Sequence, residues 1–449
     1  MPLTPALPAP PAPAAAVGAP AAASAREPVP GPDRVLVRLS DVEQAIARWK
    51  RRWPDLVHAS VLGTTREGRP IRLLRIGPGA TPGPNLPETL LLAGIHPREQ
   101  QPTLCLLRFV EELLEARQRH DIDDGDLLDR QVLWVVPAFN PDGKAWEERH
   151  PDWRKNRAPL GNGVFGVDLN RNFQVRWGGA RQLDPLWRTT TDTPSADIHE
   201  GPAPLSEPET KALVDFWNQR PNLRAFLDIH SPLREILSPA YVPAGDGLRF
   251  ARLIEGMRAA QATPYAGPNH RFEQTPPLGE RTGNSGLTYH HAYYTRGIFG
   301  LNYEFSNPSK DQGVAGRYPS LADADREYAA NARGAWKWFL RIAPTLPATL
   351  PGRVAPLGPE SIRPAPAPGT VVRWTPPLFD GAVDWAVLTS PSPQVQILSE
   401  VRYAPFTIPF TVRIAPDAKP GARVPLVLHL WDRGRRHTER TFELTVGTP

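Results

Sequence analysis

Short apolar runs alternate with amphipathic stretches along the chain as far as residue 345. Apolar runs that are typical of buried strands occupy residues 90–93, 132–136, 223–229 and 299–305. Apolar residues at helical spacing predict two helices, at 105–114 and 210–217. Because strands separated by helices are typical of α/β folds, we expect a sheet flanked by helices in this part of the chain.

The pattern changes after residue 345. Residues 346–370 are rich in Pro and Ala, and beyond them apolar residues no longer recur at helical spacing. Two stretches then alternate strictly between apolar and polar residues, with apolar side chains at Phe406, Ile408, Phe410, Val412 and Ile414 and at Phe442, Leu444 and Val446. Alternation with a period of two predicts half-buried strands, so we expect a small antiparallel β-sandwich here.

These patterns divide the chain into four predicted parts. Residues 1–32 consist largely of Pro and Ala and are expected to be disordered. Residues 33–345 form a large α/β domain, residues 346–370 a Pro-rich linker, and residues 371–449 the β-sandwich. The first part lacks the basic start of a signal peptide, although its small residues resemble a cleavage site, so targeting stays open.

Composition and charge exclude several classes of protein. Hydrophobic residues make up 40% and charged residues 22% of the 449 positions, which excludes a chain that is disordered throughout. No apolar run approaches the roughly 20 residues of a membrane-spanning helix. The net charge, 52 − 47 = +5, is spread along the chain without a nucleic-acid-binding motif, so we expect no nucleic-acid partner. The single cysteine, Cys105, excludes internal disulfides and zinc sites built from several cysteines.

Three residues of metal-ligand type stand at the ends of predicted strands. His96 and Glu99 are three positions apart just after one strand, and His230 closes another. Two imidazoles and one carboxylate, with water in the fourth position, make a catalytic zinc site. Taken singly, each is weak evidence, because a histidine at a strand end is more often a structural residue and Glu99 could be a solvated residue at a helix start.

Further motifs follow these residues in a fixed order. They are Asn-Pro-Asp-Gly at 140–143, Trp-Arg-Lys-Asn-Arg at 153–157, Gly-Val-Asp-Leu-Asn-Arg-Asn-Phe at 166–173, Gly-Pro at 201–202, Ser-Glu-Pro-Glu-Thr at 206–210 and Tyr-Glu-Phe at 303–305. In this order the sequence resembles the zinc carboxypeptidases of the carboxypeptidase A type, and looks most like the bacterial carboxypeptidase T branch, over residues 40–340.

The resemblance implies a fold and a metal site. The fold would be a mixed, mostly parallel sheet flanked by helices, with residues 33–345 as the catalytic domain. One Zn²⁺ would bind to His96, Glu99 and His230. Asp168 would accept a hydrogen bond from a ligand imidazole and so fix its tautomer; outside this motif it would be read as an ordinary turn aspartate.

The resemblance also implies the residues that act on substrate. Asn170 and Arg171 would bind its terminal carboxylate, for which a planar guanidinium is well shaped. Arg154 would polarise the scissile carbonyl, and Glu304 would be the general base and acid. From the residues alone, Arg171 could instead form a surface salt bridge, and Glu304 could lie exposed on an edge strand.

The region before Glu304 departs from the family pattern. No tyrosine aligns with the mobile tyrosine of the family, and Tyr265 and Tyr289 are both candidates. Residues 283–296, where the floor of the side-chain pocket is expected, contain no acid. A buried cation needs a partner, so we expect a preference for apolar or aromatic C-terminal residues, provided that no distant acid such as Asp246 or Glu280 enters the pocket.

The expected activity is zinc-dependent hydrolysis of the last peptide bond of peptides or proteins that have a free C-terminus. A hydrolase or amidase of the same fold acting on cell-wall stem peptides is the first alternative. The second is an inactive binding protein anchored by the β-sandwich, against which the intact ligand set and Glu304 argue. The family's habit favours a secreted or extracytoplasmic location, while a cytoplasmic one, the oligomeric state and the role of the β-sandwich stay open.

Overall fold

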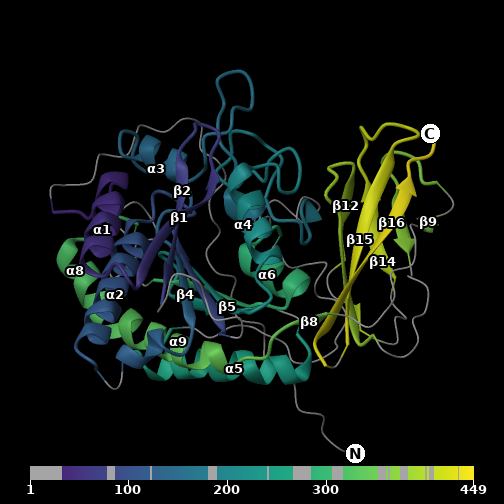
Figure 1. Ribbon diagram of the computed structural model, residues 1–449. Helices are drawn as coiled ribbons and strands as arrows, with labels where there is room; N and C mark the ends of the chain where they lie inside the picture. The colour runs from purple at the N-terminus through teal and green to yellow at the C-terminus, as the bar shows by residue number, and fades with distance from the viewer. Residues whose placement is uncertain are drawn as a thin grey trace, which may run out of the picture.

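The computed structural model describes two regions that lie side by side (Figure 1). The described residues are 33–77, 86–121, 124–179, 190–239, 242–265, 285–305, 317–351, 360–362, 365–374, 383–399, 402–403, 409–432 and 434–448. We call the part up to residue 345 the α/β region and the part from residue 350 the β region. The predicted disordered segment 1–32 and the predicted strand residues Phe406 and Ile408 lie outside the described residues, as does Glu280.

The α/β region is built on a seven-stranded sheet with the order β1-β2-β4-β3-β5-β7-β6. The strands are β1 Val57–Thr64, β2 Pro70–Ile76, β3 Glu88–Ala93, β4 Val132–Val136, β5 Leu223–His230, β6 Glu235–Leu237 and β7 Phe299–Glu304. The four central strands, β4, β3, β5 and β7, run parallel, and the outer strands pair antiparallel. The mixed, mostly parallel sheet is therefore confirmed, and its parallel centre consists of the four strands predicted from apolar runs.

Helices cover both faces of this sheet because its side chains alternate between two apolar clusters. Leu91 of β3 joins a cluster with α1, α2, α5 and α9, whereas Leu90 joins one with α4 and α6. The helices are α1 Leu39–Arg52, α2 Gln100–Gln118, α3 Pro141–Glu147, α4 Pro208–Asn218, α5 Ala244–Ala259, α6 Thr288–Arg296, α8 Leu321–Glu327 and α9 Arg333–Ile342. The two predicted helices lie within α2 and α4. Among the described residues, no helix combines the length and the apolar character that crossing a bilayer requires.

The β region consists of two sheets, as the alternating pattern predicts. One has the order β10-β14-β12; the other has the order β13-β11-β15-β16-β8, with β9 also paired to β16. The strands are β8 Leu350–Pro351, β9 Glu360–Ile362, β10 Val371–Trp374, β11 Trp385–Thr389, β12 Val395–Ile397, β13 Arg402–Tyr403, β14 Phe410–Ile414, β15 Arg423–Trp431 and β16 Arg436–Thr445. Phe410, Val412 and Phe442 are buried between the sheets. The segment expected to be a linker supplies β8 and β9, which pair parallel with β16.

The two regions share apolar packing. Trp385 and Trp431 stack with ring centroids 5.0 Å apart, and Trp385 stacks in turn on Tyr293 of α6. The indole N–H of Trp431 donates a hydrogen bond to the Tyr294 carbonyl at 3.1 Å. These tryptophans belong to the same buried cluster as the α/β core, so part of one core extends across the boundary.

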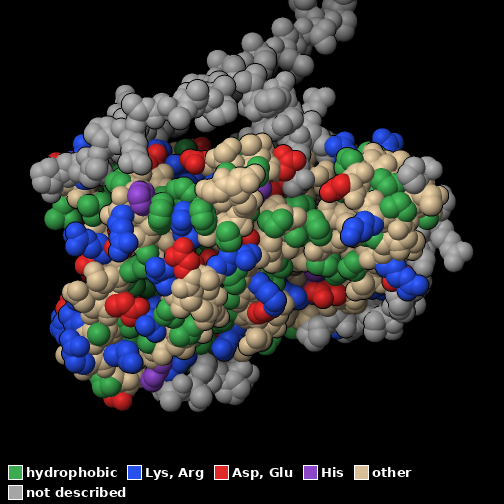
Figure 2. All heavy atoms as spheres, turned by 90° about the horizontal axis from the view of Figure 1, so that it is seen from above, with side chains coloured by type: hydrophobic (Ala, Val, Ile, Leu, Met, Phe, Trp, Pro, Cys, Tyr) green, Lys and Arg blue, Asp and Glu red, His purple; other side chains and the backbone are tan. Residues whose placement is uncertain are grey.

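A buried arginine adds a polar contact between the regions. Arg435 lies in the turn between β15 and β16 with a φ of 58°. Its guanidinium forms an ion pair with Asp246 of α5, donates to the Gly297 carbonyl, and lies 4.5 Å from the ring centroid of Phe299. Elsewhere the surface is mixed: on the face seen in Figure 2, basic and acidic side chains lie interspersed.

Candidate metal centre and active site

Two neighbouring parallel strands bring the candidate ligands to one edge of the sheet. The chain leaves β3 through Gly94, whose φ of 74° favours glycine, and a Cβ there would come within 3.1 Å of the backbone of Ala138. His96 follows in this turn, and Glu99 directly precedes α2. His230 is the last residue of β5, which pairs with β3. The carboxyl ends of these strands therefore place residues more than 130 positions apart in contact.

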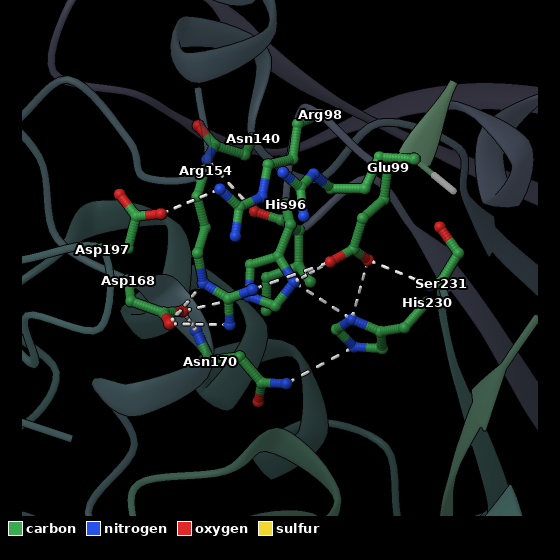
Figure 3. A network of polar contacts seen from close by, with 12 residues as sticks. His96, Arg98, Glu99, Asn140, Arg154, Asp168, Asn170, Asp197, His230 and Ser231 are labelled. Atoms are coloured by element: carbon green, nitrogen blue, oxygen red, sulfur yellow. Dashed lines mark hydrogen bonds and ion pairs between the residues drawn. The ribbon is translucent and has the colours of Figure 1, made fainter. Parts of the chain in front are cut away.

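His96, Glu99 and His230 form what we call the sheet-edge cluster (Figure 3). One carboxylate oxygen of Glu99 lies 2.8 Å from His96 Nδ1, and the other lies 3.2 Å from His230 Nδ1. The two Nδ1 atoms are 3.2 Å apart. All three side chains are buried. Two imidazole nitrogens that face each other and a carboxylate are suited to a shared cation, so the donor set fits Zn²⁺.

Each histidine of the sheet-edge cluster has a carboxylate at its other ring nitrogen. Asp168 Oδ1 lies 3.1 Å from His96 Nε2, and Asp228 Oδ2 lies 3.0 Å from His230 Nε2. Such acceptors hold the proton on Nε2 and leave the Nδ1 lone pair for a metal. Asp168 was expected from the sequence, but Asp228 was not. The sequence could have suggested Asp228, because it lies two residues before His230 on the same strand. Residues two positions apart on a strand have their side chains on the same face of the sheet.

The charges around Asp168 keep it ionised. Burial would raise the pKa of this carboxyl, but Arg154 and then His96 outweigh that effect and hold the pKa well below its usual range. Arg154 contributes Nε and Nη2 at 2.9 Å from Asp168 Oδ2, and its Nη1 lies 3.7 Å from Glu99. The structure thus places Arg154 directly beside the sheet-edge cluster.

A short 3₁₀ turn, Leu169–Arg171, positions the two residues expected to bind substrate. The Asp168 carboxylate caps this turn by accepting the N–H of Asn170 at 3.0 Å. The Asn170 amide lies 3.4 Å from His230 Nε2 and accepts the Thr288 N–H at 3.0 Å. Arg171 follows it and is partly buried; burial lowers the pKa of its guanidinium, and the nearby Asp168 opposes that effect. Both side chains therefore lie next to the cluster.

Glu304 ends β7 directly beside His230, its partner in the parallel register. Because β7 lies between β5 and β6, the interpretation of Glu304 as an exposed edge residue is wrong. Its Oε2 is buried and has no hydrogen-bond partner among the described residues. Burial raises the pKa of Glu304 to about 7, with the charge of Glu99 adding to the effect and His230 opposing it. A carboxyl of this pKa can both accept and donate a proton near neutral pH.

The two candidate tyrosines lie on opposite faces of the sheet. Tyr265 contacts Tyr303 and donates to Glu327 in the cluster around α9. Tyr289, on α6, lies on the face of the sheet-edge cluster; burial raises its pKa, while the nearby Arg171 lowers it. Only Tyr289 is therefore near enough to act there, and its role stays a prediction.

Comparisons with known proteins agree with this geometry. The profile of the zinc carboxypeptidase family matches residues 42–314. Carboxypeptidase B of Rattus norvegicus is 37% identical over 193 residues, 41% of this chain and 43% of that protein. Carboxypeptidase A1 of Sus scrofa is 33% identical over 295 residues, 64% of this chain and 65% of that protein. The chain thus spans about two fifths to two thirds of the length of these relatives.

Solved structures show the same fold. Thrombin-activatable fibrinolysis inhibitor superposes with a TM-score of 0.57 at 21% identity, covering 69% of this chain and 74% of that one. Carboxypeptidase A of Helicoverpa armigera gives 0.56 at 22% identity with the same coverage. The placement nearest the bacterial carboxypeptidase T branch stays a prediction. Since the family profile extends over more than half of the 449 residues and spans the sheet-edge cluster, this chain belongs to the zinc carboxypeptidase family.

Proposed function

We propose that this protein is a zinc-dependent metallocarboxypeptidase that removes the C-terminal residue of peptides or proteins. The observation that supports the proposal best is the buried sheet-edge cluster, beside which one Glu304 oxygen has no hydrogen-bond partner in the part of the chain that the structure describes. We assign the zinc ligands to His96, Glu99 and His230. When bound, Zn²⁺ supplies a Lewis acid that activates a water and polarises a carbonyl.

The residues around the cluster have separate tasks in this proposal. Glu304 takes a proton from the attacking water and donates it to the leaving amine, for which a pKa of about 7 suits both steps. Arg154 stabilises the negative charge that develops on the scissile carbonyl oxygen. Asn170 and Arg171 bind the terminal carboxylate and so select the last peptide bond.

The substrate preference is proposed to be for apolar or aromatic C-terminal residues. The described part of the expected pocket floor, residues 285–296, contains no acid. Asp246 is paired with Arg435 at the boundary between the regions. Asp228 is an acid that the sequence had not suggested for this pocket: its Oδ2 is bound by His230 and Thr288, and its Oδ1 is buried without a partner among the described residues. Blocked peptides that end in Phe or Leu should have higher kcat/KM than those ending in Lys or Arg; the reverse would point to Asp228 as the pocket charge.

The test of the function combines metal content with substrate choice. His96→Ala should lower the zinc content by one equivalent and abolish hydrolysis of blocked dipeptides. The wild-type enzyme should prefer a free C-terminal carboxylate to its amide by at least ~10²-fold, because an uncharged amide forgoes the charge-assisted hydrogen bonds that a guanidinium such as that of Arg171 makes to a carboxylate. Arg171→Ala should remove that preference. Cleavage of stem peptides or amidated substrates without the preference would favour the cell-wall hydrolase or amidase instead, and zinc-loaded protein without activity would favour a binding protein.

A further inference from the structure

A second group of metal-ligand residues lies on the hairpin of β15 and β16. In the antiparallel register His429 stands directly opposite Glu439, and Trp431 stands opposite His437. Because side chains alternate along a strand, these residues share one face of the hairpin. The other face carries Leu428 and its apolar neighbours in the core of the β-sandwich. The polar group therefore faces the α/β region.

The distances within this group are those of a chelate. His429 Nδ1 lies 3.1 Å from His437 Nε2 and 3.5 Å from Glu439 Oε1. Ligand atoms bound to one tetrahedral zinc at about 2.0–2.2 Å are about 3.3–3.6 Å apart. The two imidazole planes differ by 8°, and their centroids are 5.3 Å apart. All three ligand atoms lie within 4.8 Å of one another, so movements of about an ångström would bring them around one ion.

Neighbouring side chains fix the orientation that metal binding needs. The hydroxyl of Thr389 lies 3.1 Å from His429 Nε2 and 3.5 Å from the Val427 carbonyl. It can donate to the carbonyl and accept the Nε2 proton, which leaves the lone pair on His429 Nδ1. Trp431 stacks on the ring of His437 with centroids 4.4 Å apart.

We propose that His429, His437 and Glu439, the hairpin cluster, form a second zinc site, separate from the sheet-edge cluster. The inference depends on the geometry of the β region and not on the proposed peptidase activity. The simpler interpretation of the same contacts is a hydrogen bond between the two imidazoles and an ion pair between Glu439 and a cation.

That cation is Arg296 at the end of α6, whose Nη1 lies 2.9 Å from Glu439 Oε1. An arginine beside a ligand carboxylate does not exclude a metal, since Arg154 lies 3.7 Å from Glu99 in the sheet-edge cluster. The position of Arg296 links zinc binding to the packing of the two regions. Glu439 would bridge the ion and Arg296, so zinc at the hairpin cluster would stabilise the contact between the β region and α6.

The test counts zinc in the full-length chain. The protein is stripped with a chelator, reloaded with Zn²⁺ and desalted, and its metal content is measured together with its activity on a blocked dipeptide. Wild-type protein should hold two equivalents. His437→Gln and Glu439→Gln should each hold one and remain active, whereas His230→Ala should hold one and be inactive. Thr438→Ala, on the other face of the same strand, is the matched control and should hold two.

The outcomes separate this proposal from the proposed function. One equivalent in the wild type, lost in His230→Ala and unchanged in His437→Gln, would overturn the hairpin site and leave the sheet-edge site intact. Two equivalents retained in both hairpin variants would overturn it as well. Two equivalents in inactive wild-type protein, with one lost in each hairpin variant, would support the hairpin site while contradicting the peptidase activity. A second readout is thermal: Zn²⁺ added to His230→Ala should raise its Tm, and the added change His437→Gln should abolish that shift.

Discussion

The sheet-edge cluster and the hairpin cluster contain the same residue types but are built in different ways. The sheet-edge cluster gathers residues from the ends of two parallel strands, and Glu99 is only 6% exposed. The hairpin cluster comes from a single pair of adjacent strands, and the Glu439 side chain is 40% exposed. Histidines in the first are backed by the carboxylates Asp168 and Asp228, whereas in the second Thr389 supplies a neutral hydroxyl. Because a carboxylate raises the basicity of a ligand imidazole more than a hydroxyl does, we expect the sheet-edge cluster to bind zinc more tightly.

The surroundings also differ in what chemistry they allow. Beside the sheet-edge cluster lie Arg154 and Glu304, whose buried Oε2 accepts no hydrogen bond from any described residue. Thr389, Trp431 and Arg296 contact the hairpin cluster, and none of these three is a general base. The same ligand set is therefore proposed to be catalytic in one place and structural in the other.

The largest expected effect separates the two clusters outright. His230→Ala should abolish zinc binding at the sheet-edge cluster and all peptidase activity, because three protein ligands leave no redundancy. His96→Ala and Glu99→Ala should behave alike. Zinc analysis and kcat/KM on a blocked dipeptide are the measurements, and full retention of zinc by His230→Ala would show that the ligands are assigned wrongly.

The second effect isolates the proton transfer from the metal. Glu304→Gln keeps the shape of the side chain but removes its capacity to accept a proton. kcat should fall by at least ~10²-fold while the zinc content and the circular dichroism spectrum stay unchanged. A variant with nearly wild-type kcat would contradict the role of Glu304.

The third effect concerns the contact between the β region and the α/β region, and how much that contact contributes to the unfolding free energy. Arg435→Ala removes one partner of the buried Asp246, which keeps Arg249 at 3.1 Å and the Tyr293 hydroxyl at 2.8 Å. Losing one hydrogen bond between charged groups should therefore cost about 1.5–3 kcal/mol of unfolding free energy. The neighbouring Arg436, in a looser pair with Asp432 at 3.9 Å, is the matched control, and Arg436→Ala should cost less than about 1 kcal/mol. Denaturant unfolding gives both values.

A related change removes the β region altogether. A chain ending at residue 345 is predicted to keep its zinc, since every sheet-edge ligand precedes that point. It should unfold at lower denaturant, because Tyr293 loses Trp385 and Asp246 loses Arg435. Complete insolubility of every such truncation would show that the two regions form one obligate folding unit instead.

The fourth effect concerns a buried acid far from either cluster. Both carboxylate oxygens of Glu209 on α4 are buried, and burial raises its pKa from 4.5 to about 8, although its backbone N–H and the Asn156 side chain oppose that effect. The folded state therefore favours the neutral acid, so stability should be full below about pH 4.5 and fall by up to about 1.4 kcal/mol per pH unit as the pH rises to 8. Glu209→Gln should be free of this loss. The unfolding free energy of both proteins between pH 5 and 8 is the measurement; a difference that does not change with pH would contradict the shift.

The smallest effect compares the residues that orient the histidines. Asp228→Asn should weaken zinc binding at the sheet-edge cluster by about 10–100-fold, the usual cost of losing such an acceptor. Thr389→Val should weaken the hairpin cluster by less, because a neutral hydroxyl contributes less to the basicity of its imidazole. Competition with a chelator of known affinity measures both, and equal losses would remove the distinction between the two clusters.

Much of the fold was predictable because local patterns reflect local geometry. Apolar runs identified β3, β4, β5 and β7, and strict alternation identified the strand over Phe410–Ile414. Both signals arise because side chains alternate between the faces of a strand and the central strands are buried on both faces. Short strands that depend on a distant partner were less predictable. The segment expected to be a linker contributes β8 and β9, which pair with a strand far along the chain.

The candidate site shows the same limit. His96 and Glu99 could be named from the sequence because they are three residues apart, and the other proposed residues because their motifs resemble a known family. Asp228 gave only a weak signal, a charge inside an apolar strand. The hairpin cluster gave none, since ligands on two strands meet only when the register sets His429 opposite Glu439.

The sequence by itself therefore determined the four central strands of the α/β sheet, two of its helices, the alternating strands of the β region, the resemblance to a family, and the residue types available for a metal. Tertiary structure alone decided the strand order that brings His230 to Glu99, the burial that raises the pKa of Glu304, and the register of the hairpin. The physical reason is that periodicity and capping depend on neighbours along the chain. Burial, electrostatic shifts and the convergence of ligands depend on contacts between distant segments, which form only once the sheets have assembled.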